Sequence, residues 1–495
     1  MEGFTSQLSN LLDQIIVSVP AFKPELVLIF AFLGSIFSGL FLDKYWRHGS
    51  FVITVLGVLL SAYFTFGQLG QLQTGFFGML QIDSLSVYAR LIMLIALLPI
   101  LLLIRQYATD KGLKDFGELY SILLAATIGM NILTISTNWL MVFIGIETVS
   151  ISSYILVGYI STDKKQAEAT MKYMLFGSVS AAIMLYGLSL LYGFTGNLDF
   201  TDPLHIQGLI SAPKVMTSIA ILFVFVGIGF KLGFVPFHLW TPDVYEGAPT
   251  PIANFLSTVP KIAALILFER IFHAWTSTLF YFSELTMLFV TVVAIATMLF
   301  GNLIALRQSN AKRMMAYSSI GHTGMLLMAI ISSFNSDHNV LLFYIAVYSV
   351  MNIGVFAAIQ FLEKSIGSTE LDAYCGQGKN NPLLFTFFTI LGVALIGLPP
   401  TAGFIGKLLI FTATFDLYQH TKDLPILLLL IIGALTSVIS LFYYFKIPLY
   451  AFLRKGEKID QQLPTNSWAY YIAVLAGGLA ILWGLFPYLL AGLFN

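Results

Sequence analysis

The stretch GIGFKLGFVPFHLWTPDVYEGAPTP, from Gly227 to Pro251, interrupts an apolar run with glycines, prolines and a lysine. Proline lacks a backbone donor and clashes with the carbonyl four residues before it, so a helix through Lys231 must open near Pro236. Within a membrane, an opened backbone is tolerated only where protein buries it or where it lines a polar cavity. The stretch therefore predicts a broken membrane helix with a buried lysine beside the break.

A second stretch of this kind, ALIGLPPTAGFIGK, runs from Ala394 to Lys407 and lies five predicted helices further on. A repeat of five membrane spans reverses its orientation, because five is odd. Broken helices at matching positions of inverted repeats are typical of transport sites. The alternative is that glycine and proline are simply frequent in membrane helices. The lysine beside each break favours transport.

The composition is that of a membrane protein. Hydrophobic residues make up 58% of the 495 residues, charged residues 10%, and the mean hydropathy is +0.86. A soluble domain has about 25% charged residues. Runs long enough to span a bilayer recur along the whole chain. The formal net charge of zero gives no reason to expect nucleic-acid binding.

We predict an all-α membrane protein of about 14 transmembrane helices, with helices 7 and 12 broken and with inverted repeats in helices 4–8 and 9–13. Residues 1–117 would hold helices 1–3, 118–272 the first repeat, 282–450 the second, and 468–495 the last helix. The predicted helices are 24–42, 51–66, 86–104, 118–136, 138–160, 168–194, 214–232, 251–272, 282–305, 313–332, 338–362, 382–398 with a continuation to 415, 424–450 and 468–493.

Basic residues indicate the orientation. The loops after odd-numbered helices hold 15 of them, and the opposite side holds four. The 15 are Lys44, Arg47, Arg105, Lys111, Lys114, Lys164, Lys165, Arg307, Lys312, Arg313, Lys364, Lys379, Arg454, Lys455 and Lys458; the four are Lys23, Lys214, Arg270 and Lys422. Cytoplasmic loops are enriched in Lys and Arg. The prediction is a multi-pass protein of the bacterial inner membrane with both termini in the periplasm.

Redox cofactors are not expected in this chain. Its single cysteine, Cys375, excludes a disulfide framework, an all-cysteine iron–sulfur cluster and a cysteine-rich zinc site. No G-x-G-x-x-G after a strand and no Walker A lysine motif occurs.

Four ionisable residues lie where a charge is costly, about 2.5–3.5 kcal/mol near the bilayer centre. Glu147 lies in the middle of its helix and shares a face with Ser150 and Tyr154. A structural carboxylate satisfied by these hydroxyls is the alternative to a functional one. Lys231 lies beside the first break. A change in its distance from Glu147 would change the free energy of its charged form.

Lys261 opens the predicted eighth helix and Lys407 follows the second break. Lys261 lies nearer a helix end, so a lysine that snorkels to the interface is its main alternative. His238 and His322 are possible proton relays, because imidazole titrates near neutral pH. A histidine hydrogen-bonded within the helix bundle is at least as good an explanation for each.

Three segments resemble a known family. FKLGFVPFHLWTPDVYEGAPTP (Phe230–Pro251), NLIALRQSNAKRMMAYSSIGHTGML (Asn302–Leu326) and GLPPTAGFIGK (Gly397–Lys407) are similar to signatures of the antiporter-like subunits of NADH:quinone oxidoreductase (complex I) and of Mrp-type cation/proton antiporters. EATMKYMLFGSVSAAIMLYGLSLLYG (Glu168–Gly193) resembles the subunit N type. Pro260, Thr401 and the segment GHTGM depart from the usual pattern, and none of them removes an ionisable residue.

The resemblance implies that Glu147, Lys231, Lys261 and Lys407 form a proton pathway. It implies that NADH, FMN, iron–sulfur clusters and quinone belong to other subunits of the complex. The implied partners are small membrane subunits on one side and a larger antiporter-like paralogue on the other, together with lipid. The alternatives are an Mrp-type sodium/proton antiporter subunit, the equivalent subunit of a plastoquinone-reducing photosynthetic complex or of a membrane-bound hydrogenase, and a structural subunit without transport.

Overall fold

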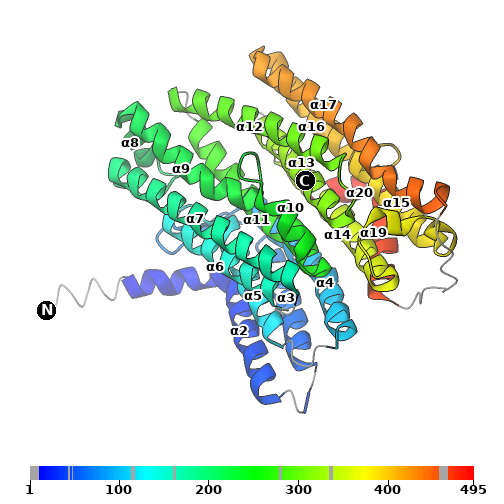
Figure 1. The fold of residues 1–495 in the computed structure, drawn as a ribbon. Coiled ribbons are helices and arrows are strands. Elements are labelled where there is room, and N and C mark those ends of the chain that lie inside the picture. Colours follow the sequence, from blue (N-terminus) through cyan, green and yellow to red (C-terminus); the bar gives the residue numbers. More distant parts are fainter. Residues whose placement is uncertain are drawn as a thin grey trace.

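A computed structural model describes residues 11–42, 45–46, 48–112, 117–159, 163–277, 281–333, 338–455 and 467–494 (Figure 1). Four of the basic residues used for the orientation, Lys44, Arg47, Lys114 and Lys458, lie outside these ranges. The described part is built almost entirely of helices, and its one two-stranded hairpin pairs β1 (Gln73–Gly75) with β2 (Leu80–Ile82). The prediction of an all-α fold is therefore confirmed.

The α-helices follow one another in this order along the chain. They are α2 (Lys23–Phe37), α3 (Gly49–Phe66), α4 (Ser84–Asp110), α5 (Gly117–Ile135), α6 (Trp139–Gly158), α7 (Lys164–Thr195), α8 (Pro203–Ser211), α9 (Lys214–Leu232), α10 (Trp240–Gly247), α11 (Thr250–Thr276), α12 (Tyr281–Ala305), α13 (Ala311–Ser332), α14 (Asn339–Ile366), α15 (Pro382–Ile396), α16 (Ala402–Thr421), α17 (Leu424–Tyr444), α18 (Lys446–Pro448), α19 (Trp468–Leu485) and α20 (Tyr488–Ala491).

Thirteen helices of the described part are long and apolar enough to cross a membrane. They correspond to all predicted spans except the twelfth, which the structure divides into α15 and α16 on either side of the second break. The expected total of 14 is reached when this pair is taken together. Helical structure also begins earlier than predicted, at residue 11, and this first segment lies at an angle to α2 (Figure 1).

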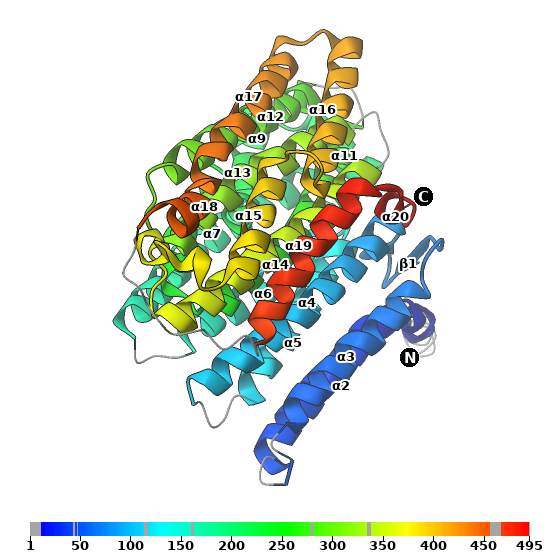
Figure 2. The ribbon, with the colours of Figure 1, turned by 90° about the vertical axis from the view of Figure 1, so that its right-hand side faces the viewer.

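Three helices form the centre of the bundle. We compare the share of buried residues in the most apolar 18-residue stretch of each helix. This share is 100% in α11, 94% in α13 and 89% in α14, against 33% in α7 and 28% in α17. The outer helices bury one face against this centre and expose large apolar side chains on the other, as lipid-facing helices do. In Figure 2, α2 and α3 form a pair at one edge, and α19 lies along α4 and α14.

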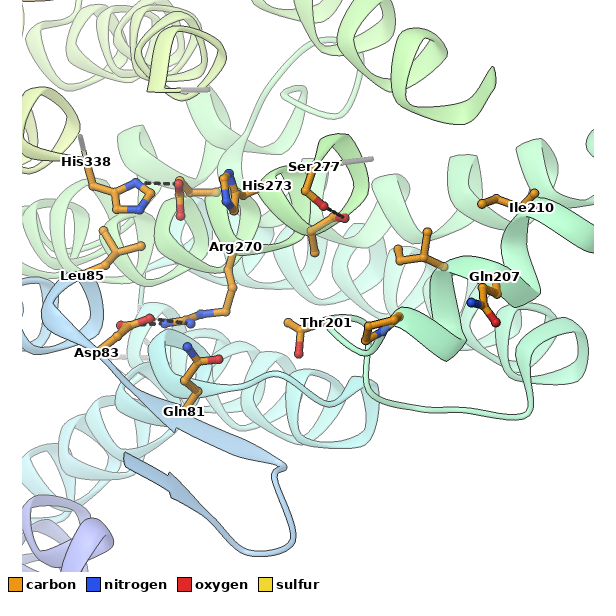
Figure 3. Close-up of a pocket in the computed structure, with 14 residues that line it drawn as sticks. Gln81, Asp83, Leu85, Thr201, Gln207, Ile210, Arg270, His273, Ser277 and His338 are labelled. Atoms are coloured by element: carbon orange, nitrogen blue, oxygen red, sulfur yellow. Dashed lines mark hydrogen bonds and ion pairs between the residues drawn. The ribbon is translucent and has the colours of Figure 1, made fainter. Parts of the chain in front are cut away.

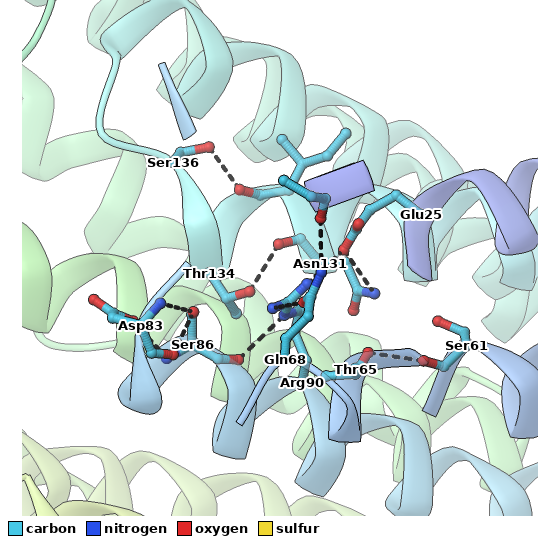
Figure 4. Close-up of polar contacts among 12 residues, drawn as sticks. Glu25, Ser61, Thr65, Gln68, Asp83, Ser86, Arg90, Asn131, Thr134 and Ser136 are labelled. Carbon is cyan, nitrogen blue, oxygen red and sulfur yellow. Dashed lines mark hydrogen bonds and ion pairs between the residues drawn. The ribbon is translucent and has the colours of Figure 1, made fainter. Parts of the chain in front are cut away.

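An ion pair is buried among the N-terminal helices (Figure 4). Arg90 on α4 donates to the carboxylate of Glu25 on α2 at 2.9 Å and to the side-chain oxygen of Gln68 at 2.8 Å. The side chains of Glu25 and Arg90 are fully buried. Removal of one partner from a buried pair leaves an uncompensated charge, so this contact fixes α2 against α4.

Candidate functional site

The first break follows α9. Gly233 has a φ of +67°, a conformation that glycine adopts at little cost, and it ends the helix. The backbone N–H groups of Gly233 and Phe234 both donate to the carbonyl of Gly229, at 2.8 and 3.2 Å. Two carbonyls of the last turn accept side-chain donors: Phe230 from the indole of Trp240 at 2.9 Å, and Leu232 from Thr323 at 3.3 Å.

Lys231 lies in this last turn and is 6% exposed. Its ammonium group donates to the hydroxyl of Ser150 on α6 at 3.3 Å. Glu147 lies one turn before Ser150, and no ion pair joins it to Lys231 within the described part of the chain. One carboxylate oxygen of Glu147 is buried and has no hydrogen-bond partner among the described residues. The carboxylate and the ammonium group are therefore neighbours across Ser150, and the hydroxyls of α6 leave part of the carboxylate unsatisfied.

Glu147 lies on the outer side of the bundle. It is half-buried in a stripe of exposed apolar residues on α6 that includes Ile144 (43% exposed) and Ile151 (54% exposed). An ionisable group in such a stripe would face lipid unless another chain covers it. Among the candidate site residues, Glu147 is thus the one that lies at the outer face of the bundle.

The second break follows α15. Gly397 has a φ of +87°, and the N–H groups of Gly397 and Leu398 both donate to the carbonyl of Val393, at 3.0 and 3.2 Å. Lys407 lies in α16, on the far side of the break, and is 6% exposed. Its ammonium group donates to the carbonyl of Ile396, the last residue of α15, at 2.8 Å. A cation is favourable there, because the C-terminal end of a helix carries partial negative charge.

Lys261 lies between the two breaks, at the centre of the bundle. It is the twelfth residue of α11 and is 4% exposed, so the snorkelling interpretation is wrong. Its ammonium group donates to the hydroxyl of Ser319 at 2.5 Å and to the carbonyl of Ser319 at 3.0 Å. The hydroxyl of Tyr348 lies 3.0 Å from the same Ser319 hydroxyl.

His322 lies on α13, one turn after Ser319. It therefore lies between Ser319, which contacts Lys261, and the small cavity beside Lys407. Its Nδ1 is 2.8 Å from the hydroxyl of Tyr344, and its Nε2 is 3.4 Å from the hydroxyl of Tyr444. A cavity of about 10 Å³ is lined by both His322 and Lys407. That volume is close to the space of one water molecule, which can bridge two polar side chains.

The structure places the candidate residues in two groups. Glu147 on α6 and Lys231 on α9 lie near Ser150, whereas Lys261 on α11, His322 on α13 and Lys407 on α16 lie around Ser319 and the small cavity. The two groups approach each other where Thr323, the residue after His322, donates to the carbonyl of Leu232, the residue after Lys231. His238 is different. It lies between α9 and α10, and its ring lies 6.3 Å from that of Phe300. Its Nδ1 is buried and has no hydrogen-bond partner in the ranges that the structure describes. Among the described residues, no hydrogen bond connects His238 to the other five.

Sequence reasoning found Ser150 but missed the other hydroxyl groups around the lysines and His322. They are Ser318, Ser319, Thr323, Tyr344, Tyr348, Ser437 and Tyr444. One signal was available: Tyr344 and Tyr348 are four residues apart in an apolar helix and therefore share a face. That face lies against the face of α13 that holds Ser319 and His322.

A cavity of about 500 Å³ lies at the C-terminal end of α11 (Figure 3). Arg270 donates to both carboxylate oxygens of Asp83, at 2.8 and 3.0 Å. Burial alone would raise the pKa of Asp83, but the Arg270 guanidinium outweighs burial and holds that pKa below its usual value. His338 Nδ1 lies 2.8 Å from a carboxylate oxygen of Glu269, and this contact raises the pKa of His338.

Fold and site define a multi-pass membrane protein with buried ionisable groups, Lys231, Lys261, His322 and Lys407, and a half-buried carboxylate, Glu147. The family described as "NADH:quinone oxidoreductase/Mrp antiporter, TM" matches residues 136–440. NADH-quinone oxidoreductase subunit N 2 of Chloroherpeton thalassium is 38% identical over 460 residues, which are 91% of this chain and 88% of the relative. NAD(P)H-quinone oxidoreductase subunit 2 of Prochlorococcus marinus (strain NATL2A) is 36% identical, over 87% of this chain and 81% of the relative.

A chain of respiratory complex I from Thermus thermophilus superimposes with a TM-score of 0.77 at 29% identity, covering 95% of this chain and 98% of that one. The chain belongs to the NADH:quinone oxidoreductase/Mrp antiporter family of transmembrane proteins. The resemblance noted in the sequence is therefore confirmed at the level of the family.

Proposed function

We propose that this chain is the antiporter-like, subunit N-type membrane subunit of a respiratory NADH:quinone oxidoreductase, and that it translocates protons through Glu147, Lys231, Lys261, His322 and Lys407. The observation that supports the proposal is Lys261, an ammonium group in the fully buried centre of the bundle that donates to Ser319. A charged lysine inside a membrane bundle without a carboxylate partner costs free energy, so such a lysine is a candidate for a functional role. The similarity to curated subunit N relatives agrees with this role.

The proposed mechanism is a stepwise transfer of protons along the axis. Two unit charges about 4 Å apart interact by roughly 4 kcal/mol at an effective dielectric near 20. A change in the separation of Glu147 and Lys231 therefore favours or disfavours the charged lysine. Hydroxyls such as Ser319 and Tyr348 can accept one proton while they release another. His322 and the water-sized cavity beside it would connect Lys261 with Lys407.

The electron carriers would belong to other subunits: NADH, FMN, iron–sulfur clusters and quinone. The exposed stripe on α6 around Glu147 would be covered by small membrane subunits, and the larger antiporter-like paralogue would lie on the opposite side of the chain. Such a cover would shield Glu147 from lipid. Cross-linking that finds this chain only as a free monomer in native membranes would contradict this assignment.

The repeats and the orientation are part of the proposal. The matching helix ends at Gly233 and Gly397 support two inverted five-helix units, 118–272 and 282–450. The excess of basic residues supports cytoplasmic odd-to-even loops and periplasmic termini in the inner membrane. The loop that holds Cys375 would then be cytoplasmic. Labelling of Cys375 by a membrane-impermeant thiol reagent added from the periplasmic side would contradict the orientation.

The test of the function is Lys261→Ala in the assembled complex. Loss of the central ammonium group should lower proton pumping by about tenfold, equivalent to about 1.4 kcal/mol, and should lower the NADH oxidation coupled to it. Lys164→Ala is the control, because Lys164 lies at the exposed start of α7. Pumping and NADH oxidation are measured in vesicles and normalised to assembled complex. Equal, near-normal values for the two variants would remove Lys261 from the pathway.

A further inference from the structure

A column of polar side chains follows one face of α11 from its N-terminal end to Lys261. Thr250, Asn254, Ser257 and Lys261 are spaced by four, three and four residues, and this spacing places them on one face of a helix. The first three are fully buried. Eleven residues of helix at about 1.5 Å each give the column a length of about 16 Å. A polar face of this length in the most buried helix of the bundle requires an explanation.

The facing helix α14 continues the same column. The side-chain amide of Asn352 donates to the hydroxyls of Ser257 at 2.5 Å and Thr258 at 2.9 Å. One turn earlier on α14, the hydroxyl of Tyr348 donates to the carbonyl of Ser257 at 3.4 Å. Tyr348 also contacts Ser319, which accepts from Lys261. A hydrogen-bonded series therefore runs from Asn352 through Ser257, Tyr348 and Ser319 to the ammonium group of Lys261. Thr250 and Asn254 continue the polar face towards the N-terminal end of α11.

Two acceptors in this column have no partner. The side-chain carbonyl oxygens of Asn254 and Asn352 are buried, and no group in the described part of the chain donates to either of them. A buried acceptor without a hydrogen bond costs about 1–3 kcal/mol. Buried water commonly satisfies such groups where several polar atoms lie together. The two oxygens thus indicate positions for water along the column.

The outer end of the column meets a cavity at the surface. This cavity has a volume of about 230 Å³ and is lined by Tyr107, Asp110, Lys111, Gln360, Glu363 and Lys364. The carboxylate of Glu363 accepts a hydrogen bond from the hydroxyl of Thr250, the first residue of the column. Lys364 and Asp110 form an ion pair of 2.8 Å among the lining residues. Glu363 therefore belongs both to the cavity and to the column.

We propose that water fills this column and carries protons between the surface cavity and Lys261, with Glu363 as the group that collects them. The proposal rests on the proposed function, because it supplies a proton to the central lysine of that axis. A hydronium ion protonates Glu363, water at Asn254 and Asn352 relays the proton, and the neutral amine of Lys261 binds it as ammonium. Each water accepts one proton and releases another, so the column is unchanged after the transfer.

The first test measures water in the column independently of pumping. In the Cys375→Ser background, which has no other cysteine in this chain, Asn254→Cys is compared with Ala253→Cys. Ala253 is equally buried and is the preceding residue of α11. The native complex in inside-out vesicles is treated with methanethiosulfonate ethylammonium. Cysteine at 254 should react about tenfold faster, a difference of about 1.4 kcal/mol in barrier. Equal rates at the two positions, both fast or both slow, would overturn the proposal.

The second test measures pumping. Asn352→Leu removes a polar group and fills the column, and should lower proton pumping about tenfold, whereas Asn352→Ser should restore most of it. The matched control is Asn131→Leu, because Asn131 on α5 is also fully buried with an unpartnered carbonyl oxygen but lies outside the column. All rates are normalised to assembled complex.

The two proposals can fail separately. If Lys261→Ala stops pumping and Asn352→Leu does not, the column is refuted and the translocation axis stands. If Lys261→Ala leaves pumping unchanged, the proposed function fails, and the route to Lys261 fails with it even where Asn254→Cys reacts selectively. Loss of pumping in Lys261→Ala and Asn352→Leu, with normal pumping in Asn131→Leu, supports both.

Discussion

In α9 and in α15, the last helical residue is followed by a glycine in the left-handed conformation. In both cases this glycine and the next residue donate to one carbonyl, that of Gly229 in the first break and that of Val393 in the second. The lysines, however, lie on different sides of the opening. Lys231 belongs to the half-helix before the first break, and Lys407 belongs to the half-helix after the second.

The position of the lysine relative to the break determines which side chains donate to the free carbonyls at the ends of α9 and α15. At the first break, Trp240 and Thr323 donate to them, and Lys231 donates to Ser150 instead. At the second break, Lys407 itself donates to the terminal carbonyl of α15. Lys407 therefore stabilises its break, whereas the first break is complete without Lys231. Two similar openings therefore differ in how their carbonyls are satisfied: a lysine does this at the second break, and other side chains do it at the first.

The strongest test of this comparison replaces each lysine with alanine. Both variants should lower proton pumping by about tenfold. Only Lys407→Ala should also destabilise the subunit, by about 1–3 kcal/mol, because the carbonyl of Ile396 loses its donor. Pumping in vesicles and the thermal unfolding of the purified complex are the measurements.

Lys407→Arg separates the two tasks of Lys407. Arginine keeps donors for the carbonyl but is not deprotonated in proteins. This variant should therefore keep more of the stability than Lys407→Ala while its pumping remains low. Equal losses of stability in Lys231→Ala and Lys407→Ala would show that the carbonyl contact of Lys407 has no structural weight.

A smaller combined effect, on stability alone, is expected from the glycines near each break. A β-carbon at Gly403 would collide with the backbone carbonyl of Ala394, which cannot move without shifting α15. A β-carbon at Gly229 would lie 2.6 Å from the rings of Phe234 and Phe237, and side chains can shift more easily than backbone. Overpacking typically costs about 1–3 kcal/mol, so Gly403→Ala should approach the upper end and Gly229→Ala the lower.

The yield of assembled complex and its unfolding temperature measure the two glycine effects. Gly193→Ala is the control, because nothing lies within 4 Å of a β-carbon at that position. A larger loss for Gly229→Ala than for Gly403→Ala would mean that the first break, rather than the second, is the more tightly packed of the two.

The breaks could be predicted because proline and glycine act on the backbone locally. Pro236 and Gly397 specify where a helix must open, whatever surrounds it. The ionisable residues beside them were found because a charge in an apolar run is conspicuous. Whether Lys261 is buried or snorkels could not be decided in this way, since the answer depends on the helices around α11.

The hydroxyl groups around the lysines could not be predicted for the same reason. Ser319 and Tyr348 lie 58 and 87 residues after Lys261, on two other helices. Serine and tyrosine are common in membrane helices, and only helix packing shows which of them meet a lysine. The pair of Asp83 and Arg270 illustrates the point as well: the sequence placed Arg270 near the end of a predicted helix and counted it for the orientation, but only packing shows that it is buried against Asp83.

The smallest predicted effect concerns an ion pair outside both breaks. Contact with Glu269 raises the pKa of His338 above its usual value near 6.5, so the pair stabilises the start of α14 where His338 is protonated. That contribution is complete below about pH 6.5 and is lost as the pH rises through the raised value. Protection of residues 339–345 from hydrogen exchange, compared between the wild type and His338→Leu, should differ near about pH 6 and converge near about pH 9.

The neighbouring pair in the same cavity is the control. Arg270 lowers the pKa of Asp83, so the contribution of that pair is lost only as the pH falls through a value below the usual 3.8. Between about pH 6 and about pH 9 the start of α4 should keep a constant protection difference between the wild type and Asp83→Asn. If the two pairs responded alike, His338 would not be the group that titrates. Both ion pairs at this cavity would then stabilise a helix end independently of pH in this range, as the contact of Lys407 with Ile396 does at the second break.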